Sequence, residues 1–210
     1  AELGELPFLK WRVAIVGPRI AGIDAALADL MLAADREPRV AVENAVGAVG
    51  ILYTSGTTGA PKGILAHNYE PFLKPLIEAC GVGPGEVMMT CMPLFHGSGL
   101  LVFGTGSIRL DAKLALAEGF SASNFWADCR RYNAVASNLF GVMIPYLMKQ
   151  LERPDDRDNP LRVALSLGCP ATEWSDFEHR FDVVIREFYG ATDASGFLLK
   201  DMAGEDIVTA

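Results

Sequence analysis

The chain has 210 residues, of which 50% are hydrophobic, and it carries 18 basic against 26 acidic side chains, a formal net charge of −8 at pH 7. An acidic protein repels phosphate backbones and anionic headgroups, so this balance argues against a nucleic-acid or anionic-membrane surface. The length suffices for one α/β body with a core of its own. No apolar run reaches the roughly 18 residues of a membrane helix, and no transmembrane segment is expected.

The cysteines and the N-terminal stretch indicate a reducing compartment. The 4 cysteines form no Cys-x-x-Cys pair, and none has a histidine at metal-ligand spacing. This pattern is typical of buried, reduced thiols. The first residues, AELGELPFLKWR, lack the charged, apolar and small-residue order of a signal peptide. We therefore expect a cytoplasmic protein.

Short apolar runs alternate along the chain with segments of helical period, which is typical of an α/β fold with a mostly parallel sheet. The strands are expected at 11–17, 48–54, 85–92, 113–117, 134–137, 162–168 and 183–190. The helices are expected at 22–35, 69–80, 98–109, 122–132, 139–151 and 173–181, with Ser121 as the N-cap of the fourth. Polar breaks at 37–45 and 152–160 predict loops, and the second, with two prolines, predicts an exposed one. The sequence thus predicts layered, mostly parallel sheets flanked by helices.

A glycine- and threonine-rich stretch, YTSGTTGAPKG, occupies residues 53–63 after the second strand. A P-loop requires Gly-x-x-x-x-Gly-Lys followed by Ser or Thr, because its backbone N–H groups wrap the phosphates while the hydroxyl reaches magnesium. Gly56 and Lys62 fit that spacing, but Pro61 replaces the second glycine and Gly63 replaces the Ser or Thr. Proline has no N–H to donate and a fixed φ. The stretch therefore argues against a Walker-type NTPase.

The same stretch is dense in small hydrogen-bond donors. They are the hydroxyls of Thr54, Ser55, Thr57 and Thr58, the backbone amides at Gly56 and Gly59, and the ammonium of Lys62. Such a set can bind an anionic polyphosphate. The alternative is a plain Gly/Thr turn between two strands.

The whole string resembles the phosphate-binding motif of the AMP-forming adenylate-forming enzymes, which include acyl-CoA synthetases, luciferases and adenylation domains of peptide synthetases. Three further segments follow in that family's order: PLFHGSG at 93–99, SLGCPA at 166–171 and EFYGATD at 187–193. The segment at 119–137 is also similar to carnitine-type and fatty acyl ligases. The resemblance covers essentially the whole chain, as the central portion of the AMP-binding N-terminal domain.

The resemblance implies a role for each motif residue. Lys62, His96 and Thr192 would be catalytic, with His96 beside the acyl pocket and Thr192 bonded to the α-phosphate. Nucleotide contacts would come from residues 54–59 and 62 and from Gly168, Cys169, Pro170, Glu187, Phe188, Tyr189, Gly190, Ala191 and Thr192, with Tyr189 stacked on adenine. Asp193 replaces the family's glutamate as the magnesium ligand, and it leaves both direct and water-mediated coordination open.

Two of these residues have alternative interpretations. His96 could instead be a loop histidine that caps a turn beside Phe95. Cys169 could be a nucleophile, but no base partner is visible, and acyl transfer in this family runs through a mixed anhydride with AMP. We therefore expect Cys169 to be a small buried thiol.

The implied activity is the ATP-dependent conversion of a carboxylic acid to acyl-AMP and then to acyl-CoA, with Mg²⁺ and with coenzyme A as co-substrate. The alternative is an inactive nucleotide- or acyl-binding module of the same fold. No candidate follows residue 193 for the family's ribose-binding aspartate or for the lysine of its C-terminal lid domain, so the isolated chain is expected to have low or no activity. A homodimer of the parent enzyme is compatible with the resemblance, whereas the sequence does not reveal the acid.

Overall fold

The structure is a computed structural model that describes residues 13–14, 25–26, 50–54, 60–66, 70–192, 197–200 and 206–209. The chain forms two compact units, Ala1–Glu43 and Asn44–Ala210. In the first unit, strand β1 (Val13–Ala14) pairs in parallel with β2 (Ala25–Ala26). The predicted helix at 22–35 is therefore wrong at Ala25–Ala26, and its other residues lie outside the described ones.

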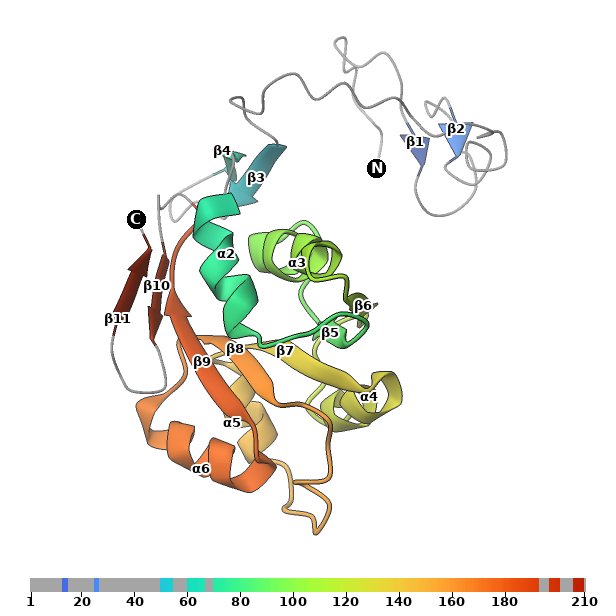
Figure 1. Cartoon of the computed structure of the whole chain (residues 1–210), viewed down its shortest axis with the longest axis vertical. Coiled ribbons are helices and arrows are strands. Elements are labelled where there is room, and N and C mark those ends of the chain that lie inside the picture. The colour runs from blue at the N-terminus through green and yellow to red at the C-terminus, as the bar shows by residue number, and fades with distance from the viewer. Residues whose placement is uncertain are drawn as a thin grey trace. The chain divides into compact units, whose positions relative to one another are not determined.

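A seven-stranded sheet organises the second unit, with the strand order β11-β10-β9-β8-β7-β5-β6 (Figure 1). Its strands are β5 (Val87–Thr90), β6 (Lys113–Leu116), β7 (Ala134–Phe140), β8 (Val163–Leu167), β9 (Val184–Tyr189), β10 (Phe197–Lys200) and β11 (Asp206–Thr209). From β9 to β6 every pairing is parallel, whereas β10 and β11 add two antiparallel strands at one edge. The expected α/β class with a mostly parallel sheet is confirmed.

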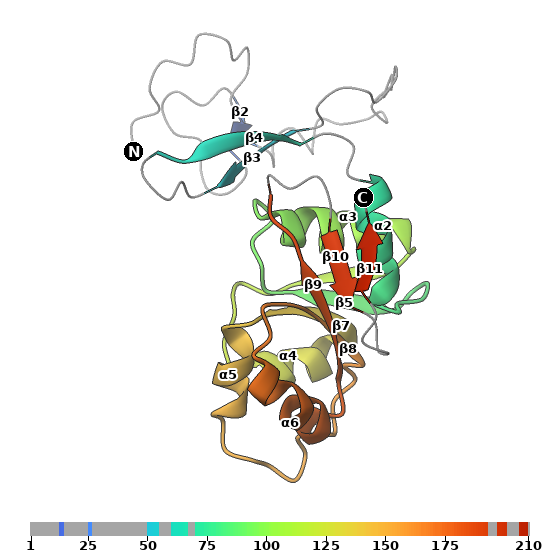
Figure 2. The ribbon, with the colours of Figure 1, turned by 90° about the vertical axis from the view of Figure 1, so that its left-hand side faces the viewer.

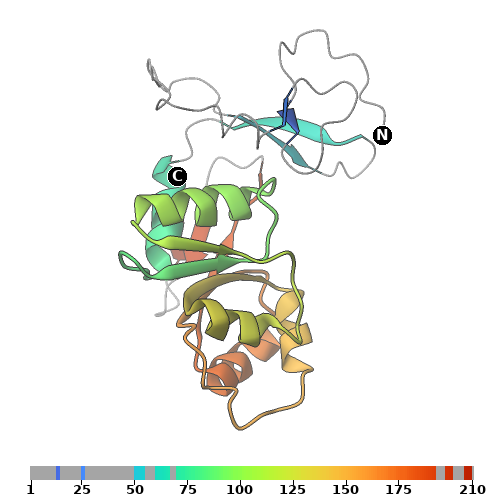
Figure 3. The same cartoon turned by 90° about the vertical axis from the view of Figure 1, so that its right-hand side faces the viewer.

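Helices cover both faces of this sheet (Figures 2 and 3). One face carries α2 (Glu70–Ala79), the π-helix η1 (Ser98–Gly104) and α3 (Thr105–Arg109). The other carries α4 (Phe125–Tyr132), α5 (Met143–Met148) and α6 (Ala171–Phe181). Because the central strands are buried on both faces, they read in sequence as continuous apolar runs rather than as alternating ones.

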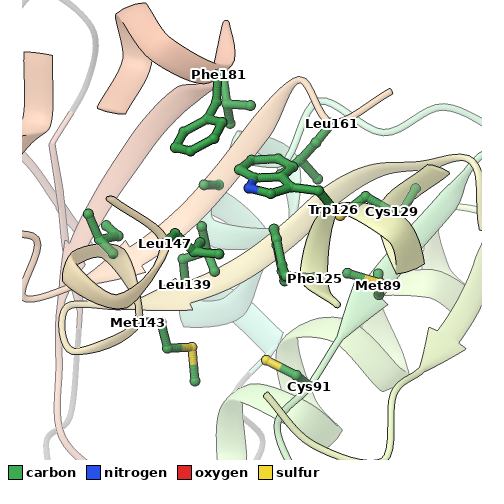
Figure 4. Close-up of a cluster of buried hydrophobic side chains, with 14 of the residues drawn as sticks. Met89, Cys91, Phe125, Trp126, Cys129, Leu139, Met143, Leu147, Leu161 and Phe181 are labelled. Atoms are coloured by element: carbon green, nitrogen blue, oxygen red, sulfur yellow. The ribbon is translucent and has the colours of Figure 1, made fainter. Parts of the chain in front are cut away.

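Each face has its own hydrophobic cluster. Leu76, Met88 and Phe103 are completely or almost completely buried on the α2 face. On the opposite face, the Trp126 ring of α4 stacks on Phe181 of α6 with 4.4 Å between ring centroids (Figure 4). These aromatic contacts fix α4 and α6 against the same side of the sheet.

Several predicted boundaries differ from the structure, three of them by three or four residues at the ends of neighbouring elements. Strand β7 continues to Phe140, and α5 therefore begins at Met143 instead of residue 139. Helix α4 begins at Phe125, three residues late, and Asn124 precedes it without a side-chain cap. Ser121 is thus not the N-cap, although its carbonyl accepts hydrogen bonds from the N–H groups of Asn124 and Phe125. Buried apolar runs carry no period that separates a strand end from a helix start.

The loop at 152–160 is exposed over most of its length, as predicted, but Asp156 is buried. Asp156 accepts a 2.7 Å hydrogen bond from Nε of Arg180, and the two side chains are 11% and 10% exposed. The same guanidinium donates to the backbone carbonyls of Met148, Gln150 and Leu151. This ion pair therefore fastens the loop to α6.

The substitution Asp156→Asn tests this pair, because it keeps the shape and removes the charge. We expect the free energy of unfolding to fall by about 3 kcal/mol, since Arg180 would stay buried without its counter-charge. Urea unfolding at pH 7 measures the change. Asp158→Asn, in the same loop but exposed, is the control and should change stability by less than about 0.5 kcal/mol. Equal effects of the two variants would contradict a stabilising role of the pair.

Candidate functional site

A cavity of about 190 Å³ lies at the carboxyl ends of the central strands. Phe140, Leu167 and Phe188 line it, and each is the last or next-to-last residue of its own strand, β7, β8 or β9. In open α/β sheets, ligands bind in the crevice outside the carboxyl ends of the strands. The position of this cavity makes it the candidate binding site.

Two sequence motifs about 90 residues apart meet in this cavity. His96, Gly97 and Ser98 of the PLFHGSG motif line it together with residues 190–192 of the EFYGATD motif. Parallel pairing explains the meeting, because β5 and β9 both lead their following loops to the same edge of the sheet. The structure thus brings together the predicted residues His96, Gly190, Ala191 and Thr192.

His96 is held in one orientation by its neighbours. Its Nδ1 accepts a 3.1 Å hydrogen bond from the backbone N–H of Ser98, and its ring centroid lies 5.6 Å from that of Phe140. Partial removal from water lowers the pKa of His96 below its ordinary value. Because Nδ1 accepts, the neutral ring carries its proton on Nε2, which is then a hydrogen-bond donor.

Glu187 ties the EFYGATD motif to the SLGCPA motif. Its carboxylate accepts hydrogen bonds from the backbone N–H groups of Gly168, at 2.5 Å, and Cys169, at 3.3 Å. Gly168 has a positive φ of 81°, which glycine adopts without strain. With both N–H groups bonded to Glu187, the predicted wall of Gly168, Cys169 and Pro170 can offer a ligand its carbonyls and side chains.

Cys169 is half-buried, while the other three cysteines are fully buried. Burial, assisted by the nearby carboxylates of Glu187, Glu173 and Glu178, raises the pKa of the Cys169 thiol to about 12. The nucleophilic form of cysteine is the thiolate. At neutral pH this residue is therefore a thiol, as expected for a residue without a nucleophilic role.

Neighbouring residues of β9 point to opposite sides of the sheet. Phe188 is buried and lines the cavity, whereas the side chain of Tyr189 is on the other side and 71% exposed. An exposed aromatic ring at the end of a central strand is available for stacking on a planar ligand. The predicted adenine contact of Tyr189 stays a prediction.

The glycine- and threonine-rich stretch connects two antiparallel strands, β3 (Gly50–Thr54) and β4 (Lys62–Ala66), and the second of these strands was not predicted. Thr54 pairs with Lys62 across this hairpin, and Lys62 is exposed. Leu52 of β3 lines the cavity. The predicted phosphate-binding residues Ser55 to Gly59 lie outside the described residues.

Asp193, the predicted magnesium ligand, also lies outside the described residues. Within the part of the chain that the structure describes, no three His, Cys, Asp or Glu side chains are grouped as a metal site. In the same part of the chain, no helix combines the length and the apolar character that crossing a bilayer requires.

Sequence reasoning missed most of the apolar lining. Leu73 of α2 and Leu101 and Val102 of η1 line the cavity from segments without a functional pattern. The contribution of Leu167 could have been found, because it is a large side chain at the carboxyl end of a predicted parallel strand.

Comparison with known protein families shows where this chain belongs. The family model described as "AMP-binding enzyme" matches residues 17–209. The chain belongs to this family of adenylate-forming enzymes. The predicted family is thereby confirmed for nearly the whole chain.

Two curated relatives of this AMP-binding chain carry names linked to fatty acids. Long-chain fatty acid transport protein 2 of Rattus norvegicus is 38% identical over 150 residues, which are 70% of this chain and 24% of that protein. Medium/long-chain-fatty-acid–CoA ligase FadD17 of Mycobacterium marinum is 32% identical over 175 residues, 81% of this chain and 35% of that protein. The chain thus spans about a quarter to a third of the length of these relatives.

Solved structures share this fold. A benzoate CoA ligase from Burkholderia xenovorans LB400 superposes with a TM-score of 0.71 at 19% identity, over 86% of this chain and 37% of that one. At this identity the likeness concerns the fold alone.

Two glycines allow the turns beside the cavity to approach each other. Gly141, just after β7, donates its N–H to the carbonyl of Leu167 at 2.8 Å. A Cβ atom on Gly141 would lie only 1.7 Å from the carbonyl oxygen of Gly168. The end of β7 and the turn after β8 can therefore touch only if residue 141 has no side chain.

The substitution Gly141→Ala should force these two turns apart. We expect the free energy of unfolding to fall by about 2 kcal/mol, the usual cost of overpacking a tight contact. Urea unfolding measures it, with Gly119→Ala as the matched control, because a Cβ there meets nothing within 4 Å. If Gly141→Ala were as stable as Gly119→Ala, the close approach of the two turns would be wrong.

Proposed function

We propose that this chain forms the nucleotide- and acyl-binding core of an AMP-forming acid:CoA ligase. The observation that carries the proposal is the cavity in which His96 of one family motif meets Gly190 to Thr192 of another. The cavity is apolar on the side of η1 and β7 and polar at the motif residues, which suits an acid with a hydrocarbon body and a reacting carboxylate.

The proposed reaction has two steps. A carboxylate oxygen of the acid attacks the α-phosphorus of ATP, the bond to the bridging oxygen breaks, and acyl-AMP and pyrophosphate result. The thiol sulfur of coenzyme A then attacks the acyl carbonyl, its proton is lost, and AMP leaves. In the first step two anions approach each other, so the site has to supply donors and cations and to align the nucleophile.

The residues divide these tasks between them. Nε2–H of His96 would donate to a carboxylate oxygen in the cavity. The hydroxyl of Thr192 would bond the α-phosphate, Tyr189 would stack on adenine, and the loop from Thr54 to Lys62 would bind the β- and γ-phosphates. Asp193 would hold a magnesium ion, which neutralises phosphate charge.

The names of the relatives favour a fatty acid as the substrate, since they describe fatty acid transport and fatty acyl-CoA ligation. The description of the family as AMP-binding supports an adenine nucleotide as the second substrate. Within the proposal, residues 1–210 are the central portion of the AMP-binding domain, and the protein acts in the cytoplasm. An inactive binding module of the same fold is the competing function.

Pyrophosphate release by the natural protein that contains these residues, tested with a panel of carboxylic acids, separates the two functions. We expect acid-dependent release, and a fall in kcat/KM of about 100-fold or more in Lys62→Ala and in Thr192→Ala, because each loses a donor to the transition state. Lys149→Ala, an exposed lysine on the opposite face of the sheet, should keep the full rate. A folded protein that releases no pyrophosphate with any acid would rule out the ligase.

A further inference from the structure

Two polar side chains are completely buried where the central strands approach the PLFHGSG motif. Thr90 is the last residue of β5, and Asn138 lies on the neighbouring strand β7. The Thr90 hydroxyl donates a 2.8 Å hydrogen bond to Oδ1 of Asn138, so side chains as well as backbones join these two parallel strands. Polar groups buried in an apolar core call for an explanation.

The Thr90 hydroxyl also fixes the start of the His96 turn, which comprises residues 92–97 after β5. Its oxygen accepts a 3.1 Å hydrogen bond from the backbone N–H of Met92. A hydroxyl can donate one hydrogen bond while it accepts another. Thr90 therefore joins β7 to the first residue of the turn, and this double bonding sets the direction in which the chain leaves β5.

Close contacts connect the start of the His96 turn to the imidazole. The carbonyl of Pro93 accepts a 2.9 Å hydrogen bond from the backbone N–H of His96, and Nδ1 of His96 accepts one from the N–H of Ser98. A Cβ atom on Gly99 would lie 2.5 Å from the carbonyl oxygen of Pro93 and 2.9 Å from that of Met92. The turn and the start of η1 are thus packed as one unit, so a displacement at Met92 would move His96.

Strand β7 supports the His96 ring at a second point. Phe140 follows Asn138 by two positions on β7, so both side chains lie on the same face of the sheet. The centroid of the Phe140 ring is 5.6 Å from that of His96. Strand β7 therefore holds the turn at its start, through Asn138 and Thr90, and holds the imidazole itself through Phe140.

Stability alone does not explain the pair of Thr90 and Asn138. Among the described residues, Nδ2 of Asn138 is buried without a hydrogen-bond partner. A buried donor left unpaired is destabilising, whereas replacing both members of such a pair by apolar side chains of the same shape can be neutral or even stabilising. The polar pair is better explained by the turn that it holds in place.

We propose that Thr90 and Asn138 are positioning residues for His96: together they set the path of the His96 turn, and with it the direction of the imidazole that would donate to the acid. The inference rests on the proposed function, because it takes His96 as the residue that receives the carboxylate. It goes beyond that function, since neither Thr90 nor Asn138 lines the cavity and neither belongs to a motif of the family described above.

The double variant Thr90→Val, Asn138→Leu in the natural protein tests the proposal, because it keeps the shape of the pair and removes its polar groups. We expect it to fold, and kcat/KM for the acid in pyrophosphate release to fall about tenfold or more, since a small misplacement of a positioned group is costly. The KM for ATP should stay within about twofold of the natural value, because other segments bind ATP. Thr90→Val alone should act in the same direction, and Thr90→Ser, which keeps the hydroxyl, should retain the rate.

A double-mutant cycle with His96 separates positioning from a general effect on the fold. If Thr90 and Asn138 act through His96, the same two substitutions made in His96→Ala should change kcat/KM for the acid by less than about twofold. Equal losses in the presence and in the absence of His96 would overturn the inference.

Ser137→Ala is the matched control. Ser137 precedes Asn138 on β7 and is equally buried, and its hydroxyl has no partner among the described residues, but its side chain points to the opposite face of the sheet. This variant should keep the full kcat/KM for the acid. A loss as large as that of the double variant would contradict a specific role of Thr90 and Asn138.

The His96 ring gives a second readout that needs no turnover. In protein labelled at histidine, the NMR shifts of the ring nitrogens report which nitrogen carries the proton, and loss of a signal in His96→Gln identifies that of His96. We expect the natural protein to show the Nε2–H tautomer, which the bond from Ser98 N–H to Nδ1 selects. The double variant should show a mixture of the two tautomers, and unchanged shifts would overturn the inference.

The two readouts separate the inference from the proposed function. A change of tautomer in the double variant, without pyrophosphate release by the natural protein with any acid, would support the positioning of His96 and remove the ligase activity. Acid-dependent release with the same kcat/KM in the double variant would leave the ligase intact and overturn the positioning role.

Discussion

Parallel strand pairing is the constraint on which the site depends. From β9 to β6 the strands run in one direction, so the segments that follow them emerge at one edge. The register places Phe140 opposite Leu167, and both line the cavity. A slip of one residue would turn these side chains to the other face of the sheet. Hydrogen bonds of the sheet thus decide which motif residues can meet.

Backbone contacts between turns then refine what the sheet positions. Ser166 pairs with Glu187 in the ladder between β8 and β9, and this register brings the Glu187 carboxylate to the N–H groups of the turn at Gly168. Gly141 packs against the same turn from β7. Three strand ends are therefore joined through one turn. The charge-assisted hydrogen bond of Glu187 and the absence of a side chain at Gly141 thus hold the three strand ends together without a large contact surface.

The sequence predicted the order of the central elements, because buried strands and amphipathic helices have different apolar patterns. It did not predict where β7 ends, since Leu139 and Phe140 continue an apolar run that a helix could also contain. The burial of Asp156 depends on Arg180, which is 24 residues further along the chain. Likewise, the π-helical turn of η1 within the predicted helix 98–109 left no local pattern in the sequence. The family motifs identified His96, whereas the cavity beside it required the fold.

The repulsion between the two anionic substrates of the proposed reaction explains why the site needs both a neutral histidine and separate cations. His96 is partly removed from water, its pKa is lowered, and its Nδ1 accepts from the N–H of Ser98, so the neutral ring offers a single donor at Nε2. A neutral ring does not offset the repulsion between a carboxylate and a triphosphate. In the proposed reaction that task passes to Lys62, which is exposed at the end of the β3–β4 hairpin, and to a metal ion. In that reaction the cavity could stay apolar enough for a hydrocarbon body, because the phosphate charge would be neutralised at the hairpin rather than inside the cavity.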